Sequence, residues 1–401
     1  MQNRSGAILQ KGVGRKRRQS VLEYIYETES VYFAQVSESV KKEAAEELGE
    51  LGAQHIKERF RGIRFSCDRK TFYKIVYMSR LLSRVLAPLK TFDCRDTDEL
   101  YKNVKKIKWE QFLAPKNTFA VVANVSNSEI THSKFAAYRV KDAVVDYFSD
   151  RAGKRPNVDT DDPDLVVNLH VKDDKADISI DASGGALHRR GYREETVSAP
   201  MQETVAAAMI RLSGWDGKTR LHDPMCGSGT ILCEALMQNS RIPAGIFRKK
   251  FGFQKLPDYD ETLWKSVKAE MDAGIRETPQ GLVSGGDLAE EAVNASRTNL
   301  MGLHYGNRVE IRQQDLKHAG PFHNMVIMTN PPYGIRMGKD IDLKRFYKMF
   351  GDFLKQKCKG SEAYVYFGDP GFIKNVSLKP SWKKELRLGG LDGRLVKFSL
   401  Y

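Results

Sequence analysis

The second half of the chain alternates short apolar segments with longer amphipathic ones, and this alternation most restricts the fold. Apolar stretches of strand length recur, and residues between them show helical spacing. Strands that alternate with helices form a parallel sheet, because each parallel connection needs a crossover. The sequence therefore predicts a doubly wound α/β sheet, with strands at 219–222, 281–284, 309–312, 325–328 and 363–367 and helices at 201–212, 231–237, 290–300 and 343–354.

Two more strands are expected near the end of the chain, at 384–388 and 394–400. The glycine-rich link between them is too short for a parallel crossover, so the two strands must be antiparallel. One edge of an otherwise parallel sheet should therefore be antiparallel.

The first half of the chain predicts two small α+β modules. Strands at 31–36 and 63–65 alternate with helices at 40–51 and 71–86, and a strand at 119–123 and a helix at 135–148 follow. A charged turn at 172–175 joins two alternating strands at 165–171 and 176–180 into a hairpin. The stretch 184–193, rich in glycine and arginine, is expected to connect domains or to line a nucleic-acid path.

These patterns divide the chain into five expected parts. They are a basic, disordered extension at 1–30, a first module at 31–72, a second at 73–183, a connector at 184–200 and the large α/β domain at 201–401.

The composition indicates a multidomain protein with a preference for polyanionic partners. The chain has 401 residues, of which 41% are hydrophobic, and 65 Lys and Arg against 51 Asp and Glu give a net charge of +14. The basic start of the chain either touches RNA or only aids solubility. The five cysteines are scattered without a Cys-x-x-Cys pair, so they indicate neither a disulfide framework nor a metal site, and a reducing cytoplasm fits them best. No stretch approaches the ~20 apolar residues of a membrane span.

A polar, proline-stiffened tetrapeptide follows the apolar run 325–328. It consists of Asn330, Pro331, Pro332 and Tyr333, at a strand end where parallel sheets bind ligands. The side-chain oxygen of Asn330 and the carbonyl oxygen of Pro331 can accept the two hydrogens of an exocyclic amino group, which turns its lone pair toward an electrophile. The Tyr333 ring can stack on a flat base. The alternative interpretation is a rigid exit from the strand.

A glycine loop at 223–230 follows the first strand of the large domain and opens into a helix. Gly227 and Gly229 allow a ligand to approach the backbone, and the helix N-terminus offers free N–H donors to an anion. A dinucleotide motif needs a third glycine where Leu232 stands, which argues against NAD. S-adenosylmethionine fits instead, because it has a carboxylate and because its sulfonium methyl group is the electrophile that the Asn330 site requires.

The next two strands each end at an acidic residue. Asp287 can accept hydrogen bonds from both hydroxyls of a ribose, and Asp315 can accept one from an adenine amino group, although either could simply cap a helix. Asp287 follows Gly229 by 287 − 229 = 58 residues rather than the usual ~20. The interval 239–279 is therefore an insertion, either a lid facing the substrate or an additional packed helix. The order of glycine loop, two acids and tetrapeptide is that of a class I methyltransferase.

With these motifs the chain resembles the class I methyltransferases that carry a THUMP domain, in particular the bacterial 23S ribosomal RNA guanine-N2 methyltransferases. The resemblance extends from about Tyr32 to the C-terminus. It rests on residues 139–146, 155–164, 188–193, 223–230 and 330–334. It implies a Rossmann-like methyltransferase domain with an antiparallel seventh strand, preceded by a ferredoxin-like domain and an RNA-binding THUMP domain.

The resemblance also implies which residues act. S-adenosylmethionine would be held by Asp223, Met225, Gly227, Gly229, Asp287 and Asp315, and the guanine by residues 330–333. The expected activity is methyl transfer to the exocyclic N2 of a guanine in 23S ribosomal RNA or a pre-ribosomal particle, in the cytoplasm and without a metal. The alternatives are a transfer RNA guanine-N2 methyltransferase, an adenine-N6 methyltransferase acting on DNA, and a non-catalytic, RNA-binding ribosome assembly factor. Some members of the family carry a second methyltransferase, which is expected to be missing here.

Overall fold

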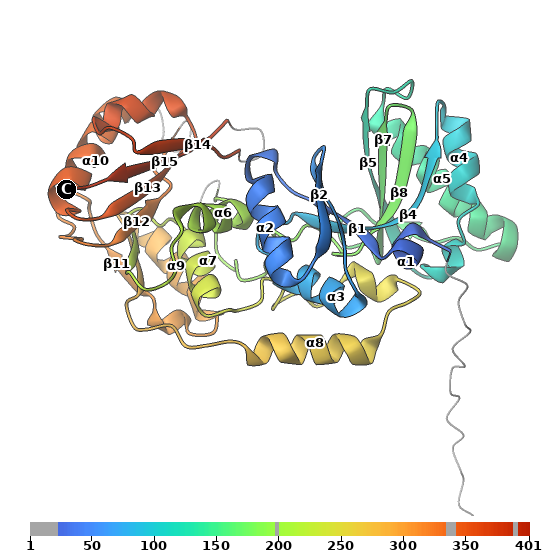
Figure 1. Ribbon diagram of the computed structural model, residues 1–401, viewed down its shortest axis with the longest axis horizontal. Helices are drawn as coiled ribbons and strands as arrows, with labels where there is room; N and C mark the ends of the chain where they lie inside the picture. The colour runs from blue at the N-terminus through green and yellow to red at the C-terminus, as the bar shows by residue number, and fades with distance from the viewer. Residues whose placement is uncertain (1–22, 197–199, 334–341, 388–391) are drawn as a thin grey trace, which may run out of the picture.

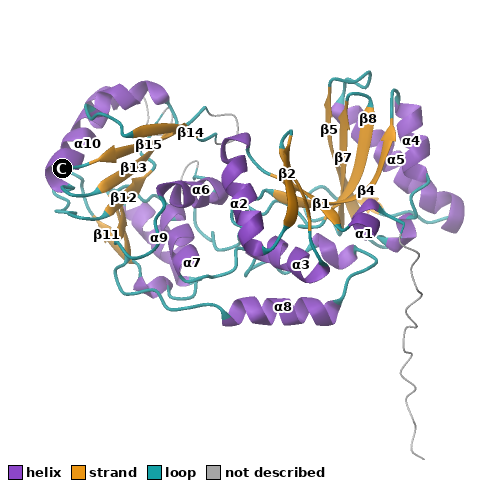
Figure 2. Ribbon diagram, in the orientation of Figure 1, coloured by secondary structure: helices purple, strands orange, loops and turns teal. Residues whose placement is uncertain are grey.

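The computed structural model describes residues 23–196, 200–333, 342–387 and 392–401. Residues 1–22 of the expected extension, Gly334 and most of the link between the last two strands lie outside these ranges. The described chain is elongated, with one sheet and its helices toward each end (Figures 1 and 2).

Within the described residues, the N-terminal half forms one continuous eight-stranded sheet in the order β2-β3-β1-β4-β8-β7-β5-β6. β4 joins the two modules, because it pairs antiparallel with β1 on one side and with β8 on the other. The strands are β1 (Val31–Gln35), β2 (Gln54–Arg59), β3 (Gly62–Ser66), β4 (Arg84–Asp93), β5 (Thr118–Ser126), β6 (Asn157–Val158), β7 (Leu165–Lys172) and β8 (Lys175–Asp181). The helices are α1 (Ile25–Glu29), α2 (Lys41–Leu51), α3 (Arg69–Met78), α4 (Thr97–Lys105) and α5 (Ser133–Ala152).

The C-terminal half forms a seven-stranded sheet within the described residues, in the order β11-β10-β9-β12-β13-β15-β14. Its first five strands in this order are parallel, and β15 is antiparallel to both of its neighbours. The expected Rossmann-like sheet with an antiparallel edge is therefore confirmed. The strands are β9 (Leu221–Asp223), β10 (Val283–Asp287), β11 (Glu310–Gln313), β12 (Val326–Thr329), β13 (Glu362–Phe367), β14 (Trp382–Glu385) and β15 (Arg394–Ser399). The helices are α6 (Glu203–Ser213), α7 (Thr230–Asn239), α8 (Glu261–Ala273), α9 (Glu290–Met301) and α10 (Leu343–Lys357).

The structure corrects the expected helix at 71–86. α3 ends at Met78, and residues from Arg84 onward belong to β4. The hydroxyl of Ser79 donates to the carboxylate of Glu47, and so does the backbone N–H of Arg80, which leads the chain out of the helix. Pro88 disguised the strand, since proline is unfavourable in a sheet ladder, but it lies at a register shift of the β4–β8 pair.

The start of the described chain is also more ordered than expected. Residues 25–29, assigned to the basic extension, form α1. Tyr24 and Tyr26 are buried in the core of the N-terminal half, and the ring of Tyr24 packs 5.2 Å from that of Phe112. Burial of these aromatic side chains fixes the segment.

The insertion at 239–279 is a packed helix and not a lid over the substrate. α8 follows the first βα unit of the second sheet in the sequence, but it packs against α3 of the N-terminal half (Figure 1). The Trp264 ring packs edge-on against Tyr73 and Tyr77, at centroid distances of 6.1 and 5.3 Å. The Tyr77 hydroxyl donates to Asp272 at 2.6 Å. The aromatic residues of the insertion therefore stabilise the contact between domains.

Two arginines of the connector also serve this contact. Arg190 is fully buried, with Nε 3.2 Å from Oε1 of Glu234 on α7. Arg193 pairs with Glu203 at 3.0 Å. These side chains are therefore engaged inside the protein, which corrects the expectation that they could line a nucleic-acid path.

Candidate active site

A cavity of about 500 Å³ lies at the carboxyl ends of the parallel strands. Asp223 at the end of β9, Asp287 at the end of β10 and Asn330 just after β12 all line it, and so does Asp315 in the loop after β11. Parallel strands place their carboxyl ends at one edge of the sheet, which is why residues far apart in sequence meet here. Met225, Gly227 and Pro332 line the same cavity, whose size suits a ligand of a few hundred daltons.

The glycine loop begins the helix α7 and is held from behind. Gly227 and Gly229 have positive φ angles of 55° and 78°, a region that side chains disfavour. A Cβ on Gly229 would lie 2.9 Å from the hydroxyl of Ser296, so a larger residue has no room. The Ser296 hydroxyl donates to the Gly227 carbonyl at 2.7 Å. Gly227 faces the cavity, whereas Gly229 shapes the turn from outside its lining.

Asp223 is a buried acid at the wall of the cavity. Its Oδ1 accepts a hydrogen bond from the backbone N–H of Met225 at 3.1 Å. Burial raises the pKa of this carboxyl to about 7, because a charged group without water is unfavourable. A cationic ligand group beside Asp223 would therefore favour its ionised form.

The other two acids are fixed by backbone donors. Asp287 accepts from the N–H of Gly227 at 2.9 Å with Oδ2 and from the N–H of Ala289 at 3.1 Å with Oδ1. Asp315 accepts from the N–H of Lys317 at 2.9 Å. Each carboxylate oxygen has a second acceptor site, so both acids can still bind ligand hydroxyl or amino groups.

The side-chain oxygen of Asn330 is a hydrogen-bond acceptor that receives no hydrogen bond from the described residues. Its Oδ1 is buried, and no hydrogen bond to it comes from any residue that the structure describes. The backbone next to it is held in place, because the Tyr347 hydroxyl of α10 donates to the Pro332 carbonyl at 3.1 Å. Buried polar atoms are nearly always satisfied, so an unpaired oxygen at a cavity wall points to a ligand that donates to it.

Tyr333 and Pro331 lie differently from Asn330 and Pro332. Both are buried, and neither lines the cavity. The Tyr333 ring covers Gly368, where a Cβ would come within 2.3 Å of the ring, and meets Tyr366 edge-on at 6.3 Å. The Tyr333 ring therefore packs into the core and, in this conformation, is not placed to stack on a base as expected.

Several apolar residues that were not expected from the sequence also line the cavity. Leu288 follows Asp287 with its side chain exposed, and Leu316 follows Asp315. Their position directly after a strand-end acid was an available signal. Ile231 directly follows the glycine loop, so its position was also an available signal. The others had none, because they come from elements that only the fold brings near, namely Pro200, Met201, Phe346 and Met349.

The described residues provide neither an activated thiol nor a metal centre. Burial raises the pKa of Cys226, which lines the cavity, so its thiol stays protonated. No group of three or more His, Cys, Asp or Glu side chains suited to a metal ion occurs in the described part of the chain. Among the described helices, none has the length and apolar composition that crossing a membrane requires.

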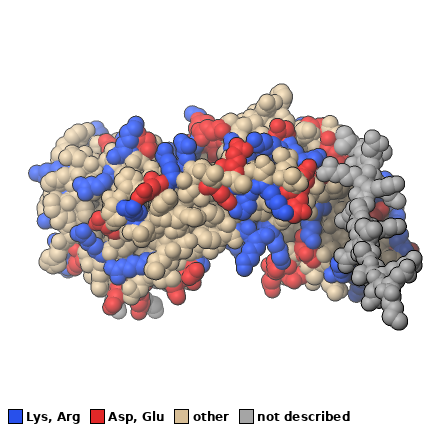
Figure 3. Space-filling view, turned by 90° about the horizontal axis from the view of Figure 1, so that it is seen from below, with Lys and Arg blue, Asp and Glu red and all other residues tan. Residues whose placement is uncertain are grey.

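Positive charge is not concentrated on the face seen from below, where basic and acidic side chains alternate (Figure 3).

Two lysines of the α4 region are engaged in ion pairs. Lys105 pairs with Asp150 at 2.8 Å and Lys108 with Glu23 at 2.9 Å. Residues 102–108 contain four lysines, and the pairing of two of them with acids is typical of an ordinary charged helix surface.

Family models match three successive parts of the chain. Residues 32–86 match the RlmL ferredoxin-like domain, residues 94–181 match the THUMP domain, and residues 190–397 match the RMKL-like methyltransferase domain. The last match covers the whole cavity and the second sheet up to the last two residues of β15.

Similar proteins include a Synechocystis protein named "Putative RNA methyltransferase", 39% identical over 92% of this chain and 97% of its own length. A ribosomal RNA large subunit methyltransferase K/L of Syntrophotalea carbinolica is 38% identical, and the match covers 92% of this chain but 53% of that protein. The chain thus spans about half the length of the K/L relatives that it matches.

Solved structures share the fold over nearly the full chain. The crystal structure of SMU.472 complexed with SAH has a TM-score of 0.80 and 26% identity, and covers 92% of this chain and 98% of that one. A structure of a possible methylase from Clostridium difficile 630 has a TM-score of 0.79 and 27% identity over the same shares.

Proposed function

Because the chain belongs to the family of RMKL-like methyltransferases, we propose that it transfers a methyl group from S-adenosylmethionine to the exocyclic N2 amine of a guanine in 23S ribosomal RNA. The observation that carries the proposal is the buried Oδ1 of Asn330, to which no described residue donates, in the same cavity as Asp223, Asp287 and Asp315. An acceptor for an amino group and a set of acids for a nucleoside thus share one space.

The residues present fit this cofactor. Asp223 would hold its ammonium group, the Gly227 loop at the start of α7 its carboxylate, Asp287 its ribose hydroxyls and Asp315 its adenine amine. Met225 and Leu288 would supply apolar contacts, and Gly229 would keep the loop in shape. Bound S-adenosylmethionine supplies a methyl group on a positively charged sulfur.

The chain's own residues would position the amine rather than activate it with a base. Asn330 Oδ1 would accept one amine hydrogen and turn the nitrogen lone pair toward the methyl group. The Pro331 carbonyl, which does not line the cavity in the observed arrangement, would have to turn toward the amine to accept the other hydrogen. With the cofactor bound, a C–N bond would replace the C–S bond, the bonding pair would stay on sulfur, and one amine proton would leave to solvent. Tyr347 would help by holding the Pro332 carbonyl.

The RNA side of the proposal rests on the THUMP domain and on the names of the K/L relatives. A structured RNA must turn the target guanine out of its stack, which costs a few kcal/mol. Ribosomal RNA, free or in a pre-ribosomal particle, would be the partner, and the cytoplasm the location.

Mapping of modified nucleotides by mass spectrometry tests the proposal. Deletion of the gene should abolish one N2-methylguanine in 23S ribosomal RNA, and expression of the wild-type chain, but not of Asn330→Ala, should restore it. Loss of a transfer RNA methylguanine instead would contradict the assigned substrate. Failure of the pure, folded protein to bind labelled S-adenosylmethionine would favour a non-catalytic assembly factor.

A further inference from the structure

A groove on the N-terminal sheet lies outside the methyl-transfer cavity, and we propose that it binds an unpaired segment of the RNA substrate. We call it the sheet groove. It has a volume of about 610 Å³ and shares no lining residue with the cavity of the methyltransferase domain. The inference rests on the proposed function in taking RNA as the substrate, and it assigns part of the binding to the ferredoxin-like domain.

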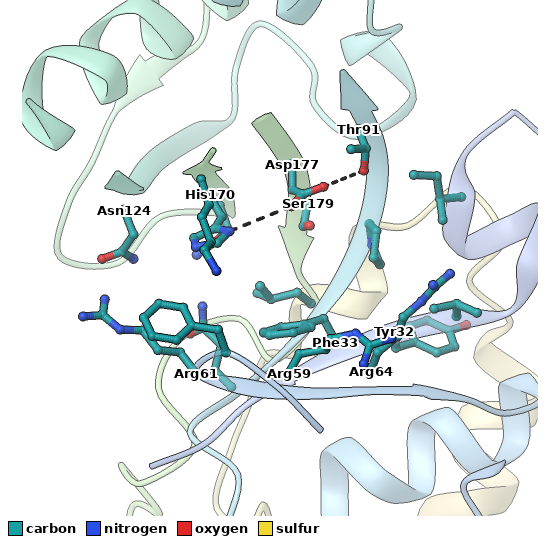
Figure 4. Close-up of a pocket in the computed structure, with 18 of the residues that line it drawn as sticks. Tyr32, Phe33, Arg59, Arg61, Arg64, Thr91, Asn124, His170, Asp177 and Ser179 are labelled. Atoms are coloured by element: carbon teal, nitrogen blue, oxygen red, sulfur yellow. Dashed lines mark hydrogen bonds and ion pairs between the residues drawn. The ribbon is translucent and has the colours of Figure 1, made fainter. Parts of the chain in front are cut away.

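Two rows of side chains from different domains face each other across the sheet groove (Figure 4). One row is polar and comes from strands β4, β5, β7 and β8. The other row comes from β1 and the β2–β3 hairpin. The labelled members of the first row are Thr91, Asn124, His170, Asp177 and Ser179, and those of the second are Tyr32, Phe33, Arg59, Arg61 and Arg64.

Two polar side chains that line the sheet groove belong to mostly buried residues, but their polar atoms are not fully enclosed and can meet a ligand in the groove. Asn168 and Ser179 are paired across β7 and β8, and are 3% and 5% exposed. Neither side chain forms a hydrogen bond with any of the residues that the structure describes, although both line the sheet groove. An amide and a hydroxyl in this position can donate to and accept from the edge of a base.

The hairpin adds an exposed aromatic ring flanked by cations. Phe60, at the β2–β3 turn, is 49% exposed. The Arg61 guanidinium lies 5.1 Å and the Lys172 ammonium 5.0 Å from the centre of its ring. An exposed ring with cations close to it can stack on a base while the cations contact phosphates.

The charge that remains in the sheet groove is positive. Its lining holds four cationic side chains and two acids, and one of the acids, Glu29, pairs with Arg64 at 2.8 Å. Within the described ranges, the guanidinium groups of Arg59 and Arg61 form no ion pair with a carboxylate. These cations favour a polyanion over an acid-poor peptide.

The combination selects unpaired nucleotides rather than a duplex. In a duplex the base faces are stacked on one another, so only phosphates and groove edges are accessible. Phe60 and the buried Asn168 and Ser179 would then have no use. A single-stranded segment uses the ring, the base-edge groups and the cations together.

Fluorescence anisotropy with the full chain tests the inference. The probe is a short, fluorescein-labelled single-stranded RNA, compared with the same strand annealed to its complement, both without S-adenosylmethionine. We expect tighter binding of the single strand, with an affinity that falls as salt rises. Phe60→Ala and Arg61→Gln should each weaken its binding, Phe60→Ala by roughly 10-fold or more, as for loss of one stacked base.

Matched controls decide the outcome. Phe135→Ala removes an equally exposed ring from α5, and Lys218→Gln removes an exposed charge from the methyltransferase domain; both should leave binding unchanged. Equal binding of duplex and single strand, or equal losses in the controls and the groove variants, would overturn the inference. Because no methyl transfer is measured, such a result leaves the proposed activity standing, and a failure of nucleotide mapping leaves the binding result standing.

Discussion

At the scale of single residues, Asn330 allows catalysis and cofactor binding to be separated. Asn330→Ala removes the buried acceptor oxygen and leaves the acids of the cavity in place. Loss of one positioned hydrogen-bonding group typically costs ~10²–10³ in kcat, so we expect turnover to fall by about 100-fold or more. The affinity for S-adenosylmethionine, measured by calorimetry, should not change.

The control for this variant is Asn103→Ala. The wild-type Asn103 side chain lies on α4, outside the cavity, and donates to the Glu99 carbonyl of its own helix. It should retain full methyl transfer into RNA. Wild-type turnover by Asn330→Ala would remove the assigned role from this residue.

Asp223 predicts a pH dependence of cofactor binding. Its pKa of about 7 means that the free protein binds a proton there at pH 6 and has largely lost it by pH 7.5. An ammonium group beside the carboxylate favours the ionised form, so binding at low pH must expel the proton. Affinity for S-adenosylmethionine should therefore rise by about 5- to 10-fold from pH 6 to pH 7.5 by linkage.

The range stops at pH 7.5 because an α-amino group itself begins to lose its proton near ~7.7–8.0. Asp223→Asn should bind more weakly and show a flat profile over the same range. A wild-type profile that is flat, or that falls as pH rises, would show that Asp223 does not face the ammonium group.

Positions of polar site residues could be predicted from the sequence, but the directions of side chains could not. Asp223, Asp287 and Asn330 follow buried strands, so their meeting at one edge is a consequence of parallel topology. The position of Tyr333 is equally regular, yet its ring packs on Gly368. That contact depends on a glycine 35 residues further along the chain (368 − 333), and the local sequence around Tyr333 does not predict it.

At the scale of elements, α10 positions the tetrapeptide through one hydrogen bond. Tyr347→Phe removes the bond to the Pro332 carbonyl and leaves the ring stacked on Phe372, 5.0 Å away. A hydrogen bond of this kind is worth about 1 kcal/mol, so we expect kcat to fall by roughly fivefold, with little change in cofactor affinity.

Tyr364→Phe is the matched control, since its hydroxyl also donates to a backbone carbonyl, that of Ser213, at 2.9 Å. It should lower stability to a similar extent without changing kcat. Equal losses of kcat in the two variants would mean that the Tyr347 bond acts on stability alone.

The turn that begins α7 has no room for a side chain at Gly229. Gly229→Ala places a Cβ 2.9 Å from the Ser296 hydroxyl at a φ of 78°. We expect the free energy of unfolding to fall by about 1–3 kcal/mol from strain and crowding, with a clear loss of cofactor affinity. Gly214→Ala, at a φ of 71° with nothing within 4 Å, carries the strain alone and should keep the affinity. Thermal melts with and without S-adenosylmethionine measure both effects.

Parallel strands of the second sheet were predictable because they are short, apolar and regularly spaced by helices. Exposed or interrupted strands were not. β2 has almost no buried residue and hence no alternation to detect, and β4 contains Pro88. The expected division between the first two domains, at 72 and 73, stays a prediction.

At the scale of the whole molecule, the packing of domains on one another follows from contacts that sequence patterns do not encode. The insertion 239–279 was expected because it lengthens a known interval. Its role as a bridge depends on Trp264 meeting Tyr77, which lies 187 residues earlier (264 − 77). Aromatic content alone was equally compatible with a lid.

Glu234 is the charge on which this assembly depends. It is fully buried and meets the equally buried Arg190, while Arg80 of the ferredoxin-like domain donates to the carbonyls of Met237 and Ile242 nearby. Arg190 also donates to the Arg80 carbonyl at 2.6 Å. One carboxylate therefore supports the junction of connector, first domain and methyltransferase domain.

Glu234→Ala leaves the guanidinium of Arg190 buried without its counter-charge, which typically costs ~3–5 kcal/mol. We expect the urea midpoint, followed by tryptophan fluorescence, to fall accordingly. Glu261→Ala breaks a largely exposed ion pair with Lys265 on α8 and should cost less than ~1 kcal/mol, because water screens both charges. If the two variants unfolded at the same urea concentration, the buried pair would not be what holds the two halves of the molecule together.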